Sequence, residues 1–375
     1  MIPYLIVGLV AAVITYITTP MVRWFSRRVG AIDYPSDRKV HANPTPTLGG
    51  LAIFLGLIGA VVVARMMPEF RDVFTQSSEI YGIFAGGVVI FLLGVVDDMR
   101  DLPAPVKLAG QVFAAGIVFL SGVKFQFVPL PDSPLLSLSD DVSVLVTILW
   151  LVAMINAVNL IDGLDGLATG IVAIAASSFF VYIFRSLEDG GLGIITAAPL
   201  ISITIVGATL GFLRHNFHPA RIFMGDSGAM LLGLVLGGAT VAGIGRALDP
   251  AAVPGASEAS DIFLAYFPLL IPLSVLALPI ADSLFAIVRR ARRRRSVFNA
   301  DKEHLHHRLM DLGHGHKKAV VVMYLWSALA AGAGLGFSFL RPDQVVYVLP
   351  LAVGAIVLYT LFPVLTKAIQ DRISF

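Results

Sequence analysis

The chain has 375 residues, of which 57% are apolar and only 14% are charged, and its formal net charge is +2. A soluble domain carries about 25% charged residues, so this composition excludes an ordinary soluble enzyme and indicates an integral membrane protein. Cysteine is absent, which excludes thiolate catalysis, thiolate metal sites and disulfides.

Eleven apolar runs follow one another along the chain, and each is long enough for a spanning helix, which needs roughly 20 mostly apolar residues. The sequence therefore predicts an all-α polytopic protein with one membrane-embedded domain over residues 1–375. The first run begins at Ile2 with no basic region before it, so we expect a spanning helix and not a removed signal peptide. The runs lie near 2–25, 48–67, 80–96, 104–122, 142–160, 167–186, 193–213, 228–247, 262–288, 319–340 and 345–367.

The basic residues predict the orientation of these helices, because Lys and Arg favour the cytoplasmic side of a membrane. With the N-terminus outside, the cytoplasmic segments hold 21 of the 27 Lys and Arg residues, and the C-terminus is cytoplasmic. The remaining polar motifs fall in the same cytoplasmic loops, near 26–47, 97–107, 159–168, 214–227 and 289–318. The coincidence is informative because the orientation was derived from Lys and Arg alone.

Asp97 and Asp98 directly follow the apolar run YGIFAGGVVIFLLGVV. Ionisable residues at the edge of a span are costly and usually functional. Two aspartates that cap a helix end and face water are the simpler alternative. Lys107 follows at a spacing that returns it to the same side of the membrane, so we favour a shared functional site.

Asn159, Asp162 and Asp165 are spaced three apart in NLIDGLDGLATG, so they share one face if the segment is helical. Asp226 stands in FMGDSG, directly before another apolar run. It could be a helix N-cap, but together with the other carboxylates it favours a metal site. Carboxylate and amide oxygens suit Mg²⁺ or Mn²⁺.

Histidines and arginines crowd the last cytoplasmic loop, in RRARRRR and HLHHRL. His304, His306 and His307 could form a zinc site, but neighbouring histidines on a helix point in different directions, and the basic surroundings suit phosphate better. The arginine run from Arg289 to Arg295 could bind nucleic acid. At the end of a span it is more often a topology anchor and a contact for anionic lipid.

Carboxylates, a lysine and basic residues on one membrane face predict a site for a phosphate substrate and a divalent metal. Neither the Walker pattern GxxxxGK[ST] nor a kinase signature is present, which argues against ATP as the donor. A secondary transporter is an alternative of another class. Transporter sites, however, lie near the bilayer midplane, whereas these motifs lie at the ends of the spans.

Five motifs over nearly the whole chain resemble those of the polyprenyl-phosphate N-acetylhexosamine-1-phosphate transferase superfamily. They are RKVHANPTPTLGG, DDMRD, NLIDGLDGLATG, FMGDSG and HLHHRL, in the order of the family. The HLHHRL loop looks like the WecA/TagO branch, which transfers GlcNAc 1-phosphate. The MraY branch uses UDP-MurNAc-pentapeptide and usually carries three consecutive histidines there. Leu305 separates the first two histidines in this chain, so an MraY-like enzyme is the alternative.

The resemblance implies a role for most of these residues. Asp226 would be the main Mg²⁺ ligand (Mn²⁺ is the other candidate), and Asn159 a second ligand. Asp97 and Asp98 would lie at the lipid phosphate, one of them as catalytic base, and Lys107 would neutralise phosphate charge. Asp165 and Phe223 would hold the uracil, with Asp162 also on the substrate side. The sugar and diphosphate would contact His304, His306, His307 and Arg308, and the first motif adds Arg38, Lys39 and His41 to the substrate-binding residues.

The resemblance also implies the reaction and its setting. GlcNAc 1-phosphate would pass from UDP-GlcNAc to undecaprenyl or decaprenyl phosphate with release of UMP, either by direct attack or through an aspartyl phosphate. This would be the first membrane step of an envelope polysaccharide such as lipopolysaccharide, teichoic acid or the arabinogalactan linker. We expect a multi-pass protein of the bacterial inner membrane with a cytoplasmic active site. The expected partners are the bilayer, both substrates and a second copy in a homodimer, and no nucleic acid.

Overall fold

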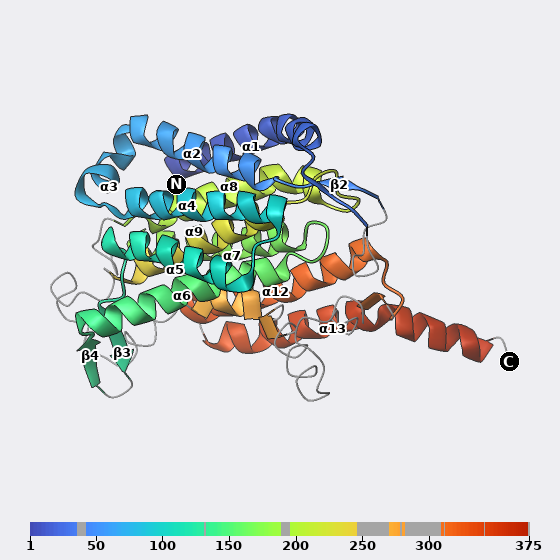
Figure 1. The fold of residues 1–375 in the computed structure, drawn as a ribbon. Helices are drawn as coiled ribbons and strands as arrows, with labels where there is room; N and C mark the ends of the chain where they lie inside the picture. Colours follow the sequence, from blue (N-terminus) through green and yellow to red (C-terminus); the bar gives the residue numbers. More distant parts are fainter. Residues whose placement is uncertain are drawn as a thin grey trace.

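The structure is a computed structural model, and it describes residues 1–35, 43–130, 133–188, 196–245, 270–277, 280–281, 309–310, 312–340 and 342–373. Long helices make up most of the described chain (Figure 1). They are α1 (Ile2–Val29), α2 (Gly50–Met66), α3 (Arg71–Gln76), α4 (Glu79–Arg100), α5 (Ala104–Leu120), α6 (Asp140–Ile161), α7 (Leu167–Glu188), α8 (Ala198–Asn216), α9 (Gly225–Gly245), α12 (His316–Phe339) and α13 (Pro342–Ile373).

Helices occur at ten of the eleven predicted runs, while the run near 262–288 lies mostly outside the described residues. Eight described helices are long and apolar enough to cross a membrane, or nine if α2 and the segment after it form one span bent by 95°. Helix α5 is apolar but shorter. The prediction of an all-α polytopic membrane protein is confirmed. The count of eleven spans and the orientation of the termini stay predictions.

Two short antiparallel ribbons accompany the helices, and the sequence did not predict them. Strands β1 (Ile32–Asp33) and β2 (Thr45–Pro46) pair directly after α1, and β3 (Phe127–Leu130) and β4 (Ser133–Ser137) pair between α5 and α6. Gly30 ends α1 in the left-handed conformation at φ 76°, which a glycine adopts without the steric cost of a Cβ atom. The chain can therefore turn sharply from α1 into β1.

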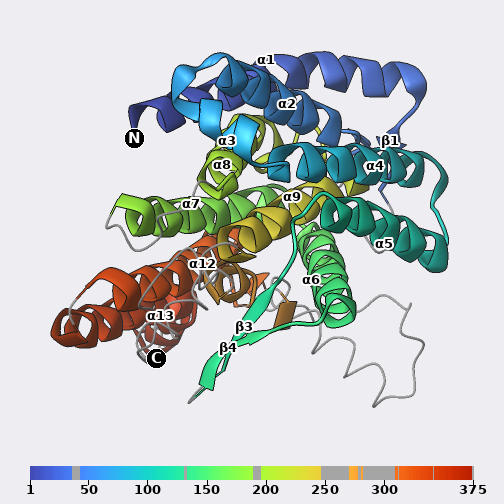
Figure 2. The same cartoon turned by 90° about the vertical axis from the view of Figure 1, so that its left-hand side faces the viewer.

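Helix α9 lies in the middle of the bundle, packed against α2, α4, α6 and α8 (Figure 2). Glycines permit this close packing. A Cβ atom on Gly50 would lie 2.3 Å from the backbone nitrogen of Gly228, and one on Gly94 would lie 2.4 Å from the Cα of Ser227. Small residues at such crossings let helix backbones approach closely within a membrane. The tightest approaches of α2 and α4 to α9 therefore occur in its first turn.

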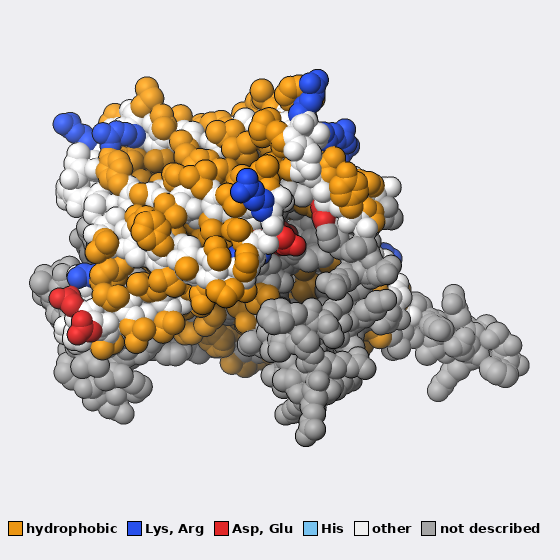
Figure 3. Space-filling view, viewed as in Figure 1, with side chains coloured by type: hydrophobic (Ala, Val, Ile, Leu, Met, Phe, Trp, Pro, Cys, Tyr) orange, Lys and Arg blue, Asp and Glu red, His pale blue; other side chains and the backbone are white. Residues whose placement is uncertain are grey.

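The outer surface of the bundle is strongly apolar. Apolar side chains are spread over the whole described part of the face in Figure 3, and Lys and Arg side chains lie mainly toward its left and right edges, where the helices end. Helix α13 is the least buried candidate span, with exposed side chains that include Val346, Tyr347 and Leu351. This distribution is that of a protein surrounded by lipid, since apolar side chains face the bilayer and cations lie at its two surfaces.

Candidate active site

Polar residues from four helix ends meet at one end of the bundle. Asp97 and Asp98 lie in the last turn of α4, and Lys107 lies in the first turn of α5. Asn159 is near the end of α6, and Asp226 is in the first turn of α9. Three sequence motifs and Lys107 thus form one cluster, which we call the carboxylate cluster: Asp97, Asp98, Lys107, Asn159, Asp162 and Asp226.

Lys107 joins two carboxylates of this cluster. Its Nζ lies 2.5 Å from Asp97 Oδ2 and 3.3 Å from Asp226 Oδ2. The Asp97 side chain is only 1% exposed, and its other oxygen accepts a hydrogen bond of 2.8 Å from the backbone N–H of Leu102. Burying a carboxylate costs free energy unless the carboxylate is paired. The contacts with Lys107 and with the Leu102 N–H offset this cost for Asp97.

Asp98 has a different set of partners from its neighbour. Its Oδ1 accepts a hydrogen bond of 2.7 Å from the backbone N–H of Asp226, and its Oδ2 accepts one of 3.2 Å from that of Ser227. These N–H groups belong to the start of α9, where helical N–H groups lack partners within the helix and favour a negative charge. Asp98 therefore anchors the helix end that carries Asp226.

The other carboxylate oxygen of Asp226 is held by α6. The Asn159 amide Nδ2 donates a hydrogen bond of 2.7 Å to Asp226 Oδ1. Asp162 follows in the turn after α6, and burial raises its pKa to about 8, with further contributions from the negative charges of Asp226, Asp98 and Asp165. The carboxylate cluster holds four carboxyl groups and one lysine, so it carries an excess of negative charge.

The excess of carboxyl groups in the carboxylate cluster favours binding of a divalent cation. Mg²⁺ is commonly held by one or two carboxylates together with substrate phosphates and water. Asp226 and Asn159 supply a carboxylate and an amide oxygen for such an ion, since the amide presents its oxygen after rotating about its last side-chain bond. The donor chemistry of these residues therefore fits the predicted metal.

Asp165 lies apart from Lys107 and bonds to the loop between α8 and α9. Its Oδ2 lies 2.7 Å from His218 Nδ1 and accepts a hydrogen bond of 3.0 Å from the backbone N–H of Ala220. The His218 ring stacks on His316, with centroids 4.0 Å apart and an interplanar angle of 17°. One ligand atom from each of these three side chains lies within 4.8 Å of the others. The ring nitrogen lone pairs of two nearly parallel rings do not converge on one point, so this geometry favours a stacked, hydrogen-bonded cluster over a metal site.

The described part of the first loop packs against the fourth motif. The backbone N–H of Gly49 donates to the carbonyl of Phe223 at 3.0 Å, and the N–H of Phe223 donates to the carbonyl of Pro46 at 2.9 Å. These two hydrogen bonds hold the backbone of Phe223, which stands two residues before Gly225. The predicted substrate-binding residues Arg38, Lys39, His41, His304, His306, His307 and Arg308 lie outside the described residues.

The structure adds residues that the sequence reasoning did not single out. His218 and His316 join Asp165, although nothing in their spacing indicates that they meet. Behind Lys107 and Asn159, the Asn156 amide donates a hydrogen bond of 2.7 Å to the Gln111 amide oxygen. Gln111 is four residues after Lys107 and Asn156 is three before Asn159, so helical periodicity could have placed both beneath the cluster.

Known proteins resemble this chain closely. A model of glycosyl transferase family 4 matches residues 80–244. A decaprenyl-phosphate N-acetylglucosaminephosphotransferase of Mycobacterium tuberculosis is 40% identical over 365 residues, which cover 96% of this chain and 89% of the relative. A Bacillus subtilis protein is 35% identical over 325 residues, which cover 87% of this chain and 82% of that protein. It is named as a probable undecaprenyl-phosphate N-acetylglucosaminyl 1-phosphate transferase.

Relatives from the other branch match less of the chain. A phospho-N-acetylmuramoyl-pentapeptide-transferase of Anoxybacillus flavithermus is 35% identical over 238 residues, which cover 60% of this chain. The match to the N-acetylglucosamine branch extends over almost the full length and includes all five motif regions. The chain belongs to the superfamily of polyprenyl-phosphate N-acetylhexosamine-1-phosphate transferases, within glycosyl transferase family 4.

Proposed function

We propose that the protein transfers GlcNAc 1-phosphate from UDP-GlcNAc to a polyprenyl phosphate and releases UMP. The observation that carries this proposal is the carboxylate cluster, where Lys107 and Asp226 meet within 3.3 Å at one end of a lipid-facing bundle. The relatives are named for transfer of an N-acetylglucosamine phosphate group to a polyprenyl phosphate, which supports the same donor group and the same class of acceptor here. An acceptor tail can lie among the helices while its phosphate meets a water-soluble donor at the membrane surface.

The proposed step is a direct attack. An oxygen of the polyprenyl phosphate forms a bond to the sugar-linked phosphorus of the donor, and the bond from that phosphorus to the bridging oxygen breaks. UMP leaves with the bridging oxygen. A phosphate monoester has a second pKa near 6, so the acceptor is largely dianionic at neutral pH and attacks without a strong base. Positioning and charge neutralisation therefore carry most of the catalysis.

The cluster divides these tasks among its members. Lys107 supplies positive charge to the attacking phosphate, and Asp97 orients the Lys107 ammonium through their contact of 2.5 Å. Asp98 positions Asp226 through the first backbone N–H groups of α9. Asp165 and Phe223 receive the uracil, and the His304–Arg308 segment receives the sugar and diphosphate, as the family resemblance implies.

Asp226 and Asn159 would hold Mg²⁺, or Mn²⁺. When bound, the ion supplies positive charge that neutralises the donor diphosphate. Burial raises the pKa of Asp162 to about 8, and repulsion from the negative charges of Asp226, Asp98 and Asp165 adds to this effect. This repulsion is the physical reason to expect a cation here.

The cellular setting is part of the proposal. We infer a multi-pass protein of the bacterial inner membrane, with the carboxylate cluster on the cytoplasmic side, where UDP-sugars are made available. The product would begin an envelope polysaccharide. A homodimer is a further expectation from the family.

The test is an assay of UMP release with purified protein in detergent. UDP-GlcNAc, UDP-GalNAc and UDP-MurNAc-pentapeptide are each supplied with and without polyprenyl phosphate, and Asp226→Asn serves as the inactive control. We expect release from UDP-GlcNAc only when the lipid is present. Preference for UDP-MurNAc-pentapeptide would identify an MraY-like enzyme, and substrate uptake into liposomes without UMP release would identify a transporter.

A further inference from the structure

A cavity with apolar and cationic lining residues includes His218, the hydrogen-bond partner of Asp165. Its volume is about 570 Å³, and it is bounded by the end of α8, the loop that follows and the start of α12. Three of its lining residues are cationic: Arg214, Arg221 and Lys317. Neither the reaction nor the family motifs assign a role to this cavity.

Arg214, Arg221 and Lys317 line this one cavity together. No carboxylate in the described part of the chain forms an ion pair with Arg214, Arg221 or Lys317 within 4.0 Å. Basic residues at the end of a span are often topology anchors, but anchors need not line a common cavity. Three cations that have no ion-pair partner among the described residues repel one another around this cavity, so the cavity favours an anion.

The polarity of the cavity changes along α8. Leu210 and Leu213 line it toward the middle of the helix, and Arg214 lines it at the helix end. Leu210 is 53% exposed on a membrane-spanning helix, and it lies one turn before Arg214 on the same face. The cavity is therefore apolar where the bilayer interior would begin and cationic where the headgroups would lie.

We propose that this cavity binds an anionic phospholipid from the leaflet on the active-site side, with the lipid phosphate at Arg214, Arg221 and Lys317 and an acyl chain along Leu210. A free phosphate ion would match the cations but not the apolar wall. His218 also lines the cavity and forms a hydrogen bond with Asp165. The lipid would therefore stabilise the loop that carries His218 and Ala220, the partners of Asp165. The inference does not depend on the identity of the sugar donor.

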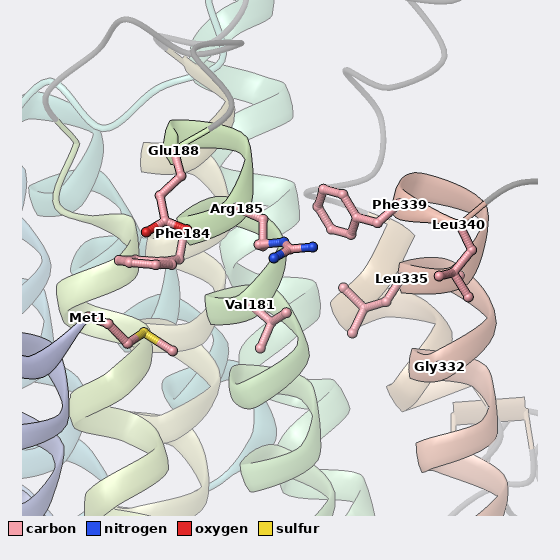
Figure 4. A pocket seen from close by; sticks show the side chains of 10 residues that line it. Met1, Val181, Phe184, Arg185, Glu188, Gly332, Leu335, Phe339 and Leu340 are labelled. Carbon is pink, nitrogen blue, oxygen red and sulfur yellow. The ribbon is translucent and has the colours of Figure 1, made fainter.

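A second cavity of similar volume differs from this one in the charges of its lining residues. It lies between the ends of α7 and α12, has a volume of about 540 Å³, and contains one cation, Arg185 (Figure 4). The Arg185 guanidinium lies 5.8 Å from the centre of the Phe339 ring, and Glu188 also lines that cavity. A single cation with an aromatic partner and a nearby carboxylate gives no comparable preference for an anion.

The experiment uses the full-length protein in nanodiscs made from equal parts of phosphatidylcholine and phosphatidylglycerol. Retained lipid is identified by native mass spectrometry after release from the nanodisc. We expect the wild-type protein to retain one phosphatidylglycerol in preference to phosphatidylcholine. The variant Arg214→Gln/Lys317→Gln should lower this occupancy roughly tenfold or more, because it removes two of the three cations that would contact the lipid phosphate.

The matched control is Arg28→Gln/Lys318→Gln, which also removes one Arg charge and one Lys charge, but from residues outside the cavity lining. It should retain phosphatidylglycerol like the wild-type protein, and thermal unfolding of all variants checks that they are folded. Equal loss in the control, or no loss in the cavity variant, would overturn the proposal. Displacement of phosphatidylglycerol by inorganic phosphate or by UMP would show a site for soluble phosphate and would also overturn it.

Discussion

The Asp98 carboxylate is joined to Asp226 through the backbone, because it accepts hydrogen bonds from the N–H groups of Asp226 at 2.7 Å and Ser227 at 3.2 Å. Asp97, its immediate neighbour, instead contacts Lys107. Adjacent residues on a helix point about 100° apart, and here this angle separates a carboxylate that holds a helix end from one that holds a cation. The two aspartates of DDMRD therefore have different tasks.

Asp98→Asn should weaken the binding of Mg²⁺ more than it slows the chemical step. The amide keeps one acceptor oxygen for the start of α9 but loses the charge, so Asp226 becomes less well positioned. Loss of a partner that orients a metal ligand typically costs 10–100-fold in metal affinity. We expect the Mg²⁺ concentration for half-maximal UMP release to rise roughly tenfold or more, with much of the turnover restored at high Mg²⁺. Lost turnover with an unchanged Mg²⁺ requirement would mean that Asp98 acts directly on the reacting phosphate.

Lys107 and Asp97 should be energetically coupled in the folded protein. Lys107→Gln leaves a carboxylate with 1% exposure without its cation, whereas the double variant with Asp97→Asn removes both charges. The coupling energy in a double-mutant cycle should be about 1–3 kcal/mol, measured by unfolding in mixed micelles with increasing SDS. Lys124 and Asp140 form the control pair, because their nitrogen–oxygen distance is 3.5 Å and Asp140 is 92% exposed. The control pair should show about 0–1 kcal/mol, and an equal value for both pairs would contradict a special role for Lys107.

EDTA should abolish activity, and Mg²⁺ or Mn²⁺ should restore it. The physical reason is the excess of carboxylates around Asp226, to which the donor diphosphate and the acceptor phosphate add further negative charge that a divalent cation offsets. Asp226→Asn should lose most turnover even at high Mg²⁺ while the protein still inserts and folds, since charge stabilisation by a metal is worth several kcal/mol. UMP release is the measurement for both. Undiminished activity in EDTA, or rescue by Zn²⁺ alone, would reject the proposed metal.

Gly50→Ala should destabilise the fold at the base of the site. The added Cβ would meet the Gly228 nitrogen at 2.3 Å, so α2 must move away from the first turn of α9. Gly116→Ala in α5 is the control, because its Cβ would have no other atom within 4 Å, and alanine is the better helix former by about 1 kcal/mol. We expect the thermal midpoint to fall for Gly50→Ala and to stay level or rise for Gly116→Ala. Equal midpoints for the two variants would show that the helix crossing is looser than described.

The sequence by itself determined the class of the protein and identified most of the residues that belong to the carboxylate cluster. Long apolar runs can bury their backbone polar groups in a bilayer only as helices, so ten helices lie where hydrophobicity predicts them. Lys107, Asn159 and Asp226 were recognisable because polar residues at the ends of apolar runs are rare and costly. Local periodicity predicted one shared face for Asn159, Asp162 and Asp165 if the segment is helical, but α6 ends at Ile161 and Asp165 pairs with His218 instead.

Only the tertiary structure decided which residues touch. The separate contacts of Asp97 and Asp98 depend on how α4 is rotated against α5 and α9, and that rotation depends on close approaches at Gly50 and Gly94 that no local pattern reveals. The Asp165, His218 and His316 cluster joins three segments separated by up to 151 residues of chain, from Asp165 to His316. The cavity at Arg214 and Lys317 likewise exists only because the end of α8 and the start of α12 lie on opposite sides of it. The length of an apolar run predicts a helix because hydrogen bonding within the run is local, but side-chain contacts between helices arise from packing of the whole bundle.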